Sequence, residues 1–221
     1  MEKDNAYETG KSMAETYTKA SSCLENLFGS LNSRYFGSML EKPVITIQST
    51  PKAYGHFTVK DTWHVWDGGR DTMKKEINIG AGTIDRPVYE VAATLLHEMV
   101  HFYNHIHGIK DVSSNGMYHN KRFKEEAEKR GLIIEKHNTY GWTVTHPSPG
   151  LCKWLDENGF TDIKMGRIEN WKKDGTNGNG DITKKKSSTR KYKCLSCGIS
   201  VRATKEVRIM CIDCNMKMEV Q

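Results

Sequence analysis

The sequence predicts an α+β fold with a helix-and-strand domain at residues 1–170, a flexible basic linker at residues 171–191 and a small cysteine module at residues 192–221. Three observations favour this class. Apolar residues recur at helical spacing in long stretches, short strand-like runs lie between those stretches, and four of the six cysteines form two Cys-x-x-Cys pairs near the C-terminus. With 221 residues, 37% of them hydrophobic, the chain is long enough to bury a core.

The N-terminal part of the chain is predicted to begin with a helix and to continue with short strands. Apolar residues recur every three or four positions from about Ser12 to Tyr35, which is typical of a helix with one buried face. After Pro43 the chain carries short strand-like runs separated by turn-forming residues. These runs are Val44 to Gln48, Gly55 to Lys60, Trp63 to Trp66 and Lys75 to Ile79. We expect them to form a small, largely antiparallel sheet.

Two further helices and a strand are predicted downstream. The first of these helices begins near Asp85 and Pro87, residues suited to a first helical turn, and runs to about His107 before Gly108. The remaining predicted elements are a charged helix from about His119 to Arg130, a strand from Leu132 to Glu135 and a short amphipathic segment from Leu151 to Glu157. The predicted order is therefore helix, strands, two helices and a strand.

The net charge of +6 comes from one short segment of the chain. Between Trp171 and Lys193 the sequence has eight basic and two acidic residues, whereas the rest of the chain is balanced. A local basic tract is typical of proteins with a polyanionic partner, so we expect nucleic-acid binding at this tract. The residues assigned to this binding are Lys184, Lys185, Lys186, Arg190 and Lys191.

The sequence also indicates the compartment. It has no apolar stretch long enough to span a membrane and no secretory signal at its N-terminus. We therefore expect a cytoplasmic protein, associated with DNA and without a membrane partner. In that compartment Cys-x-x-Cys pairs are expected to bind metal rather than to form disulfides.

The central motif is His97-Glu98-Met99-Val100-His101. Residues four apart on a helix face the same way, about 6 Å apart along its axis, so His97 and His101 can bind one zinc ion. Glu98 lies beside them, where its carboxylate can take a proton from a zinc-activated water that attacks a carbonyl. This arrangement predicts peptide-bond hydrolysis.

The helix that carries this motif is predicted to be buried. Between Pro87 and Gly108 only Glu90 and Glu98 carry a formal charge, and apolar residues cover most of the circumference. The polar residues of this helix form one stripe, which consists of Glu90, Thr94, His97, His101 and His105. A histidine stripe on a buried helix favours a metal site over ordinary core histidines.

A catalytic zinc ion needs a third protein ligand, and the sequence offers three alternatives. His119 is the preferred one, because it shares the predicted buried face of the charged helix with Phe123 and Ala127. His107 would instead extend the motif to His-Glu-x-x-His-x-x-Asn-x-x-His. The third alternative is a carboxylate of the charged helix, although a solvated helix face explains these residues more simply. They are Glu125, Glu126 and Glu128.

Two sequence blocks resemble the SprT-like family of zincin metalloproteases. The first is Glu90-Val-Ala-Ala-Thr-Leu-Leu-His-Glu-Met-Val-His101, and the second, after a gap of seventeen residues, is His119-Asn-Lys-Arg-Phe123, with Gly-Leu at positions 131 and 132 downstream. The family usually has His-Gly-x-x-Phe in the second block, where this chain has Asn120. The resemblance covers about Ser12 to Glu135 and resumes at the terminal cysteines.

The resemblance implies a zincin-like metalloprotease domain, in which a small antiparallel sheet accompanies the active-site helices. It implies that His97, His101 and His119 bind the catalytic zinc ion and that Glu98 is the general base. Many members of this family carry a zinc ribbon at the C-terminus, and this chain ends in a similar cysteine module.

The terminal cysteines predict a second, structural zinc site. Cys194 with Cys197 and Cys211 with Cys214 form two Cys-x-x-Cys pairs, and thirteen residues separate the pairs. Two such pairs held by a short hairpin give a closed tetrahedral site, as in zinc ribbons. A segment with so few apolar residues needs the metal to fold. We therefore expect two zinc ions, one catalytic and one structural.

The resemblance implies a zinc metalloendopeptidase that hydrolyses peptide bonds in DNA-associated or DNA-crosslinked proteins, as part of DNA repair. DNA, single-stranded DNA included, and protein substrates would be its partners. Two alternatives stay open, namely a DNA-binding regulatory protein with a non-proteolytic zincin scaffold and a cytosolic peptidase that acts without DNA. Glu98 argues against the regulatory protein, because a purely structural zinc ion needs no base.

Overall fold

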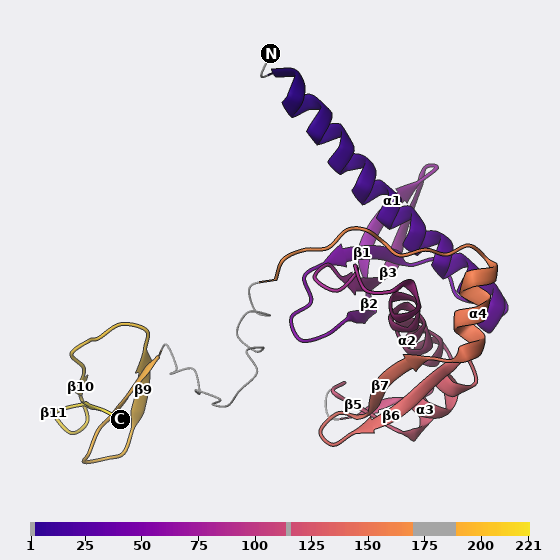
Figure 1. Ribbon diagram of the computed structural model, residues 1–221. Helices are drawn as coiled ribbons and strands as arrows, with labels where there is room; N and C mark the ends of the chain where they lie inside the picture. The colour runs from indigo at the N-terminus through magenta and orange to yellow at the C-terminus, as the bar shows by residue number, and fades with distance from the viewer. Residues whose placement is uncertain (1–2, 114–115, 170–188) are drawn as a thin grey trace, which may run out of the picture. The chain divides into compact units, whose positions relative to one another are not determined.

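The computed structural model describes residues 3–113, 116–169 and 189–221, except for the side chains of residues 3–15 and of residue 67 (Figure 1). The chain divides into two compact units, Met1–Gly175 and Thr176–Gln221, called here the N-terminal and the C-terminal unit. The N-terminal unit is an α+β structure in which the described residues form four helices and two small sheets.

Helix α1 (Lys3–Phe36) packs one face onto the core of the N-terminal unit. Leu24, Leu27 and Leu31 recur at a spacing of three and four residues and are fully buried, because this spacing places them on one side of the helix. The helix predicted from about Ser12 to Tyr35 is therefore present, and it begins earlier than the sequence pattern indicated.

The first sheet has the strand order β1 (Val44–Gln48), β3 (Arg70–Gly80), β2 (Gly55–Asp67). Strands β2 and β3 form an antiparallel hairpin, whereas β1 pairs with β3 in parallel. The sheet is thus mixed, so the expected antiparallel pairing is present between β2 and β3 and is wrong for β1. Two runs predicted as separate strands are continuous in β2, with a register shift between Thr58 and Trp63.

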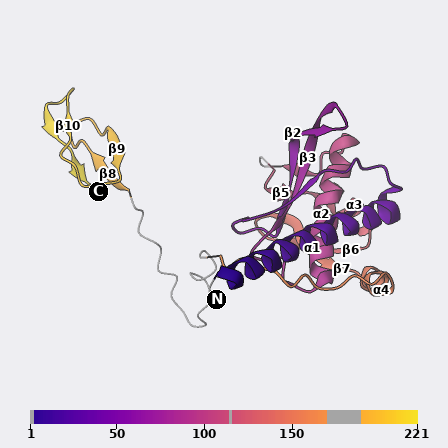
Figure 2. The same cartoon turned by 90° about the horizontal axis from the view of Figure 1, so that it is seen from above.

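Helix α2 (Val88–Ile106) lies between the two sheets of the N-terminal unit (Figures 1 and 2). Its start is fixed by Pro87 and by the carboxylate of Asp162, which accepts a hydrogen bond from the backbone N–H of Val88 at 2.8 Å. Gly108, with φ of +65°, follows the helix where the backbone becomes left-handed. The predicted burial of this helix is confirmed, since most of its residues have little or no exposed surface.

The second sheet has the order β4 (Val112–Ser113), β5 (Tyr118–His119), β7 (Gly141–Pro147), β6 (Leu132–His137). Helix α3 (Lys121–Glu128) packs against α2 and β6, and helix α4 (Pro149–Glu157) follows β7. The sequence placed His119 on the charged helix, and the structure corrects this. His119 lies in β5, and Asn120, in extended conformation, caps α3 instead.

The C-terminal unit is a small β structure that contains all four cysteines of the two Cys-x-x-Cys pairs. One sheet has the order β12 (Glu219–Val220), β8 (Arg190–Lys193), β9 (Ser200–Ala203), and a second pairs β10 (Met210–Cys211) with β11 (Met216–Lys217). Its core is formed by Tyr192, Cys194, Cys211 and Met218. Arg190 and Lys191, which the sequence analysis assigned to the linker, are part of strand β8.

None of the described helices combines the length and the apolar character that crossing a membrane requires.

Candidate metal centres and the adjoining cavity

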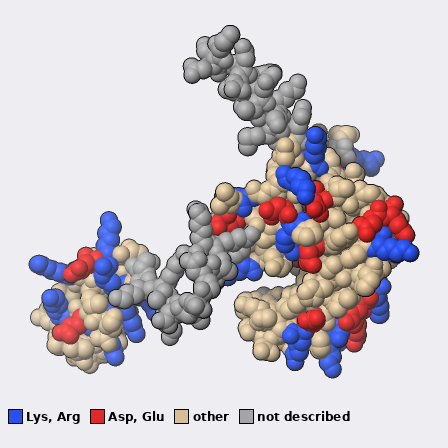
Figure 3. Space-filling model, in the orientation of Figure 1, with Lys and Arg blue, Asp and Glu red and all other residues tan. Residues whose placement is uncertain are grey.

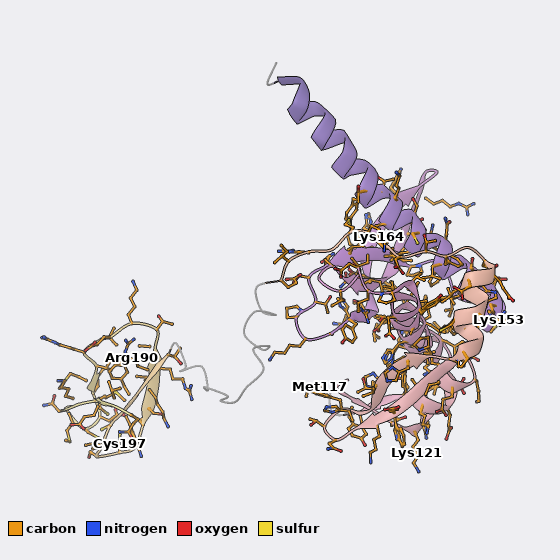
Figure 4. All side chains as sticks on the ribbon, viewed as in Figure 1. Met117, Lys121, Lys153, Lys164, Arg190 and Cys197 are labelled. Atoms are coloured by element: carbon orange, nitrogen blue, oxygen red, sulfur yellow. The ribbon has the colours of Figure 1, made fainter. Side chains whose placement is uncertain are left out.

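Three histidines from two elements converge on one point in the N-terminal unit. His97 and His101 face the same way from α2, and His119 reaches them from β5. Their Nε2 atoms are 3.2 Å apart for His97 and His101, 3.2 Å apart for His97 and His119, and 3.0 Å apart for His101 and His119. Met117 and Lys121, labelled in Figure 4, flank the short segment that carries His119. The structure thus brings together the three histidines named from the sequence.

The outer nitrogens of two of these rings are held by hydrogen bonds. The Nδ1 of His101 lies 2.7 Å from a carboxylate oxygen of Asp111, and the Nδ1 of His97 lies 2.8 Å from the hydroxyl of Thr145. Because the Thr145 hydroxyl donates to the backbone carbonyl of Thr143 at 3.1 Å, it accepts from His97. Both imidazoles therefore carry their proton on Nδ1 and direct the lone pair of Nε2 toward the shared point.

This arrangement fits a bound metal ion. Two lone pairs that face each other at 3.2 Å without a proton between them repel, and a cation removes that repulsion. Two imidazole ligands on one tetrahedral zinc ion have their nitrogens about 3.3 Å apart, because each Zn–N distance is about 2.0 to 2.1 Å. The three observed separations are close to this value. The donor set and its spacing are thus consistent with metal binding.

The phenyl ring of Phe123 forms the apolar floor of the histidine cluster. Phe123 is fully buried in α3, and its ring centroid lies 4.5, 4.6 and 4.8 Å from the rings of His97, His101 and His119. Burial, followed by the neighbouring histidines, lowers the pKa of His97 well below its usual value, and burial lowers the pKa of His119 to about 4. These two histidines are therefore neutral at pH 7, as metal ligands must be.

Glu98 borders the same cavity as the histidines. The cavity holds about 410 Å³, and its wall includes residues of β2, α2, β5 and the segment around Asp111. Burial raises the pKa of Glu98 to about 7, although the nearby His101 and a hydrogen bond from the backbone of Phe57 oppose the rise. Gly55 of β2 packs directly on Glu98, since a Cβ added there would lie 3.4 Å from the Glu98 Cγ.

The other candidate ligands lie elsewhere. His107 follows α2, where its Nδ1 bonds to the carbonyl of Tyr103 at 2.8 Å and its ring stacks on that tyrosine. Glu126 binds Lys129 and Arg130, and the remaining two glutamates also lie on α3. None of these side chains is among the described residues that line the cavity.

The residues that orient the histidines were not predicted from the sequence. Asp111 accepts a further hydrogen bond from the side-chain amide of Asn104 at 3.0 Å, and both residues are buried. Neither Asp111 nor Thr145 belongs to a recognisable motif. The one available signal was that Asp111 is the only acidic residue between the two histidine blocks.

The four cysteines of the C-terminal unit form the second candidate metal centre. Their sulfur atoms lie within 4.8 Å of one another, and the Sγ atoms of Cys197 and Cys211 are 3.6 Å apart. Two thiolates on one tetrahedral zinc ion are about 3.8 Å apart, because each Zn–S distance is about 2.3 Å. Backbone N–H groups of Cys197 and Ser196 help to lower the pKa of Cys194 to about 7, which favours its thiolate form. The cluster is consistent with a zinc ribbon.

The predicted nucleic-acid-binding residues are only partly within the described chain. Lys184, Lys185 and Lys186 lie outside the described residues, and Arg190 and Lys191 are exposed on β8. Residues 189–221 include seven basic and three acidic residues. In Figure 3, Lys and Arg side chains predominate on the visible face of the C-terminal unit, whereas both signs are interspersed on the N-terminal unit.

Comparisons of the chain with protein-family models, with curated proteins and with solved structures found no match.

Proposed function

We propose that the N-terminal unit is a zinc-dependent metalloendopeptidase of the SprT-like type, with a zincin-like fold. His97, His101 and His119 would hold the catalytic zinc ion, and Glu98 would be the general base. The substrates would be proteins associated with DNA or crosslinked to it. Four cysteines of the C-terminal unit would hold the structural zinc ion of a ribbon.

One observation carries this proposal. The Nε2 lone pairs of His97 and His101 are fixed toward a point that the Nε2 of His119 also faces, and the buried carboxylate of Glu98 lies beside that point. A purely structural site would need a fourth protein ligand, and no other described residue joins the three histidines as a candidate ligand. The three-histidine set therefore supports a site with an open position, which borders a cavity large enough to admit part of a polypeptide.

A zinc ion bound to the histidines would supply Lewis acidity, which polarises a carbonyl group and makes water nucleophilic near neutral pH. Glu98 supplies the proton transfer. Its carboxylate takes a proton from the attacking water and returns it to the leaving nitrogen, so the base ends the cycle as it began. Asp111 and Thr145 keep the two imidazoles of α2 in the tautomer that this site requires.

The position of strand β2 is an argument for a polypeptide substrate. It is an edge strand of the first sheet, and Gly55, His56, Phe57 and Val59 line the cavity. An edge strand offers backbone N–H and C=O groups to an extended peptide, which can add as a further strand. Because such bonds involve only the backbone, they would bind peptides with little dependence on sequence.

The proposed association with DNA is supported by charge. The basic tract begins at residue 172, and exposed cations continue into strand β8. Cationic side chains bind the phosphates of nucleic acids and release counterions, which makes the binding sensitive to salt. Attachment to DNA would raise the local concentration of the peptidase near DNA-bound substrates.

Cleavage of histone and casein by the full chain, with and without single-stranded DNA, tests this function. Glu98→Gln should abolish cleavage while the chain still binds two zinc ions, because the amide cannot accept a proton. Glu90→Gln is the matched control, since Glu90 lies on the same helix, forms a long ion pair with Arg86 and does not line the cavity.

The outcomes separate the alternatives. DNA-stimulated cleavage that depends on Glu98 supports the proposal, and cleavage that ignores DNA favours a DNA-independent cytosolic peptidase. Proteolysis that survives in Glu98→Gln refutes the assigned base. If the chain binds two zinc ions and cleaves nothing, the result favours a DNA-binding regulatory protein with a non-proteolytic zincin scaffold.

A further inference from the structure

Asn120 directly follows the third histidine, and three groups of its backbone and side chain make four hydrogen bonds to the neighbouring segments. Its backbone N–H donates to the carbonyl of Asp111 at 3.0 Å, and its side-chain amide donates to the carbonyl of Lys110 at 2.9 Å. The side-chain oxygen of Asn120 accepts from the backbone N–H of Arg122 at 2.8 Å and of Phe123 at 3.4 Å. Because carbonyls lie on one side and N–H groups on the other, only one orientation of the amide satisfies all partners.

These bonds join three parts of the proposed zinc site. The first part is His119, the neighbour of Asn120 in sequence. The second is the segment with Asp111, whose carboxylate orients His101 at 2.7 Å. The third is the start of α3, which places Phe123 under all three imidazoles. The backbone and side chain of one residue, next in sequence to a ligand, thus bond both to the segment that orients a second ligand and to the start of the helix that carries the floor.

An ordinary helix cap explains only half of this pattern. The cap uses the side-chain oxygen, as does Ser148 at the start of α4, whose hydroxyl accepts from the N–H of Leu151 at 3.2 Å. The amide N–H of Asn120 does something further, because it holds the backbone of the segment that precedes Asp111. The backbone of Asn120 has φ of −94°, so its conformation does not require a special residue.

We propose that Asn120 is a positioning residue of the zinc site, whose side-chain amide, bonded to the Lys110 carbonyl, helps the backbone N–H of Asn120 to hold the Asp111 segment beside His119. The proposal rests on the proposed function for the identity of the site, and it concerns zinc affinity rather than cleavage. Residues that orient metal ligands typically change metal affinity 10- to 100-fold when they are substituted. Loss of the amide donor should therefore weaken the histidine site about 10-fold.

Asn120→Ser in the full chain is the decisive variant. Serine caps a helix as well as asparagine does, so α3 keeps its cap, whereas the shorter side chain cannot reach the Lys110 carbonyl. Zinc affinity would be measured by competition with chelators of graded strength, with zinc per chain counted by native mass spectrometry. The cysteine site in the C-terminal unit is the internal reference and should keep its affinity in every variant.

Ser148→Ala is the matched control for loss of a helix cap away from the histidines. Ser148→Ala should lower stability and leave zinc affinity unchanged. Asn120→Ser should keep stability and weaken zinc affinity. Equal zinc affinity of Asn120→Ser and the parent chain overturns the proposal. This result is distinct from failure of the proposed function, in which the parent chain binds two zinc ions and cleaves nothing.

Discussion

Substitution of Phe123 by alanine tests whether the floor of the histidine cluster contributes to metal binding as well as to folding. Phe123 has no exposed surface, and replacing a fully buried phenylalanine by alanine costs about 3–5 kcal/mol of folding free energy. Its three contacts to imidazole rings, at 4.5 to 4.8 Å, lie at the separation where an aromatic pair contributes about 0.5–1.5 kcal/mol beyond burial. Without these contacts the imidazoles lose part of their fixed orientation.

The effect on metal binding can be separated from the effect on folding. Zinc bound at the proposed site would stabilise the native chain by an increment that depends on the zinc concentration relative to the dissociation constant. A 10- to 100-fold loss of affinity reduces this increment by about 1.4 to 2.7 kcal/mol. We expect Phe123→Ala to show this reduction in addition to its loss of stability in the metal-free form.

Denaturant titrations of the metal-free and zinc-loaded chains measure both quantities. The matched control is Phe28→Ala on α1, because Phe28 is also buried in the main core and, among the described residues, does not stack on any histidine ring. Phe28→Ala should lose comparable stability and keep the whole zinc increment. A zinc increment that is equally large in both variants would refute the assigned role of Phe123.

The remaining predictions concern backbone packing, pH and metal removal. Gly55→Ala should destabilise the chain, since the added Cβ would lie 2.8 Å from a backbone oxygen. Gly29→Ala on α1, where the added Cβ would meet open space, should instead stabilise the chain by about 0.5–1 kcal/mol. Thermal unfolding measures both effects. Burial opposes ionisation of Glu126, but hydrogen bonds from Lys129 and Arg130 outweigh it and lower its pKa. Its contribution to stability is therefore present above the unfolded pKa of about 4.3 and is lost as pH falls through the lower folded value, so Glu126→Gln should flatten acid unfolding in that window. Zinc chelation should unfold the C-terminal unit without unfolding the N-terminal unit, and two-dimensional NMR that still shows dispersed C-terminal signals would contradict this.

Local patterns in the sequence predicted the helices well, because helical periodicity depends on neighbours along the chain. The i and i+4 spacing of His97 and His101 sufficed to place both on one face of α2. The position of His119 at the cluster was also anticipated, but its element was not. The periodicity shared with Phe123 suggested one helix, whereas the extended backbone of Asn120 ends β5 and begins α3.

Features that depend on pairing between distant segments could not be predicted from local sequence patterns. Parallel pairing of β1 with β3 requires that β2 lie on the far side of β3, and nothing in the three runs indicates that order. The partners of the imidazoles are equally non-local. Asp111 lies ten residues from His101, and Thr145 lies 48 residues from His97, so only the folded sheet brings them together.

The histidine cluster and the cysteine cluster differ in the chemical reactions that can remove a bound metal ion. Thiolates are oxidised to sulfenic acids and disulfides, and Cys194, with a pKa of about 7, has thiolate character at neutral pH even without metal. Imidazoles resist the same mild oxidants. Oxidative stress would therefore release metal from the C-terminal unit first and leave the histidine cluster loaded. The chain would then keep the proposed catalytic site after the unit with the exposed Arg190 and Lys191 had lost its fold.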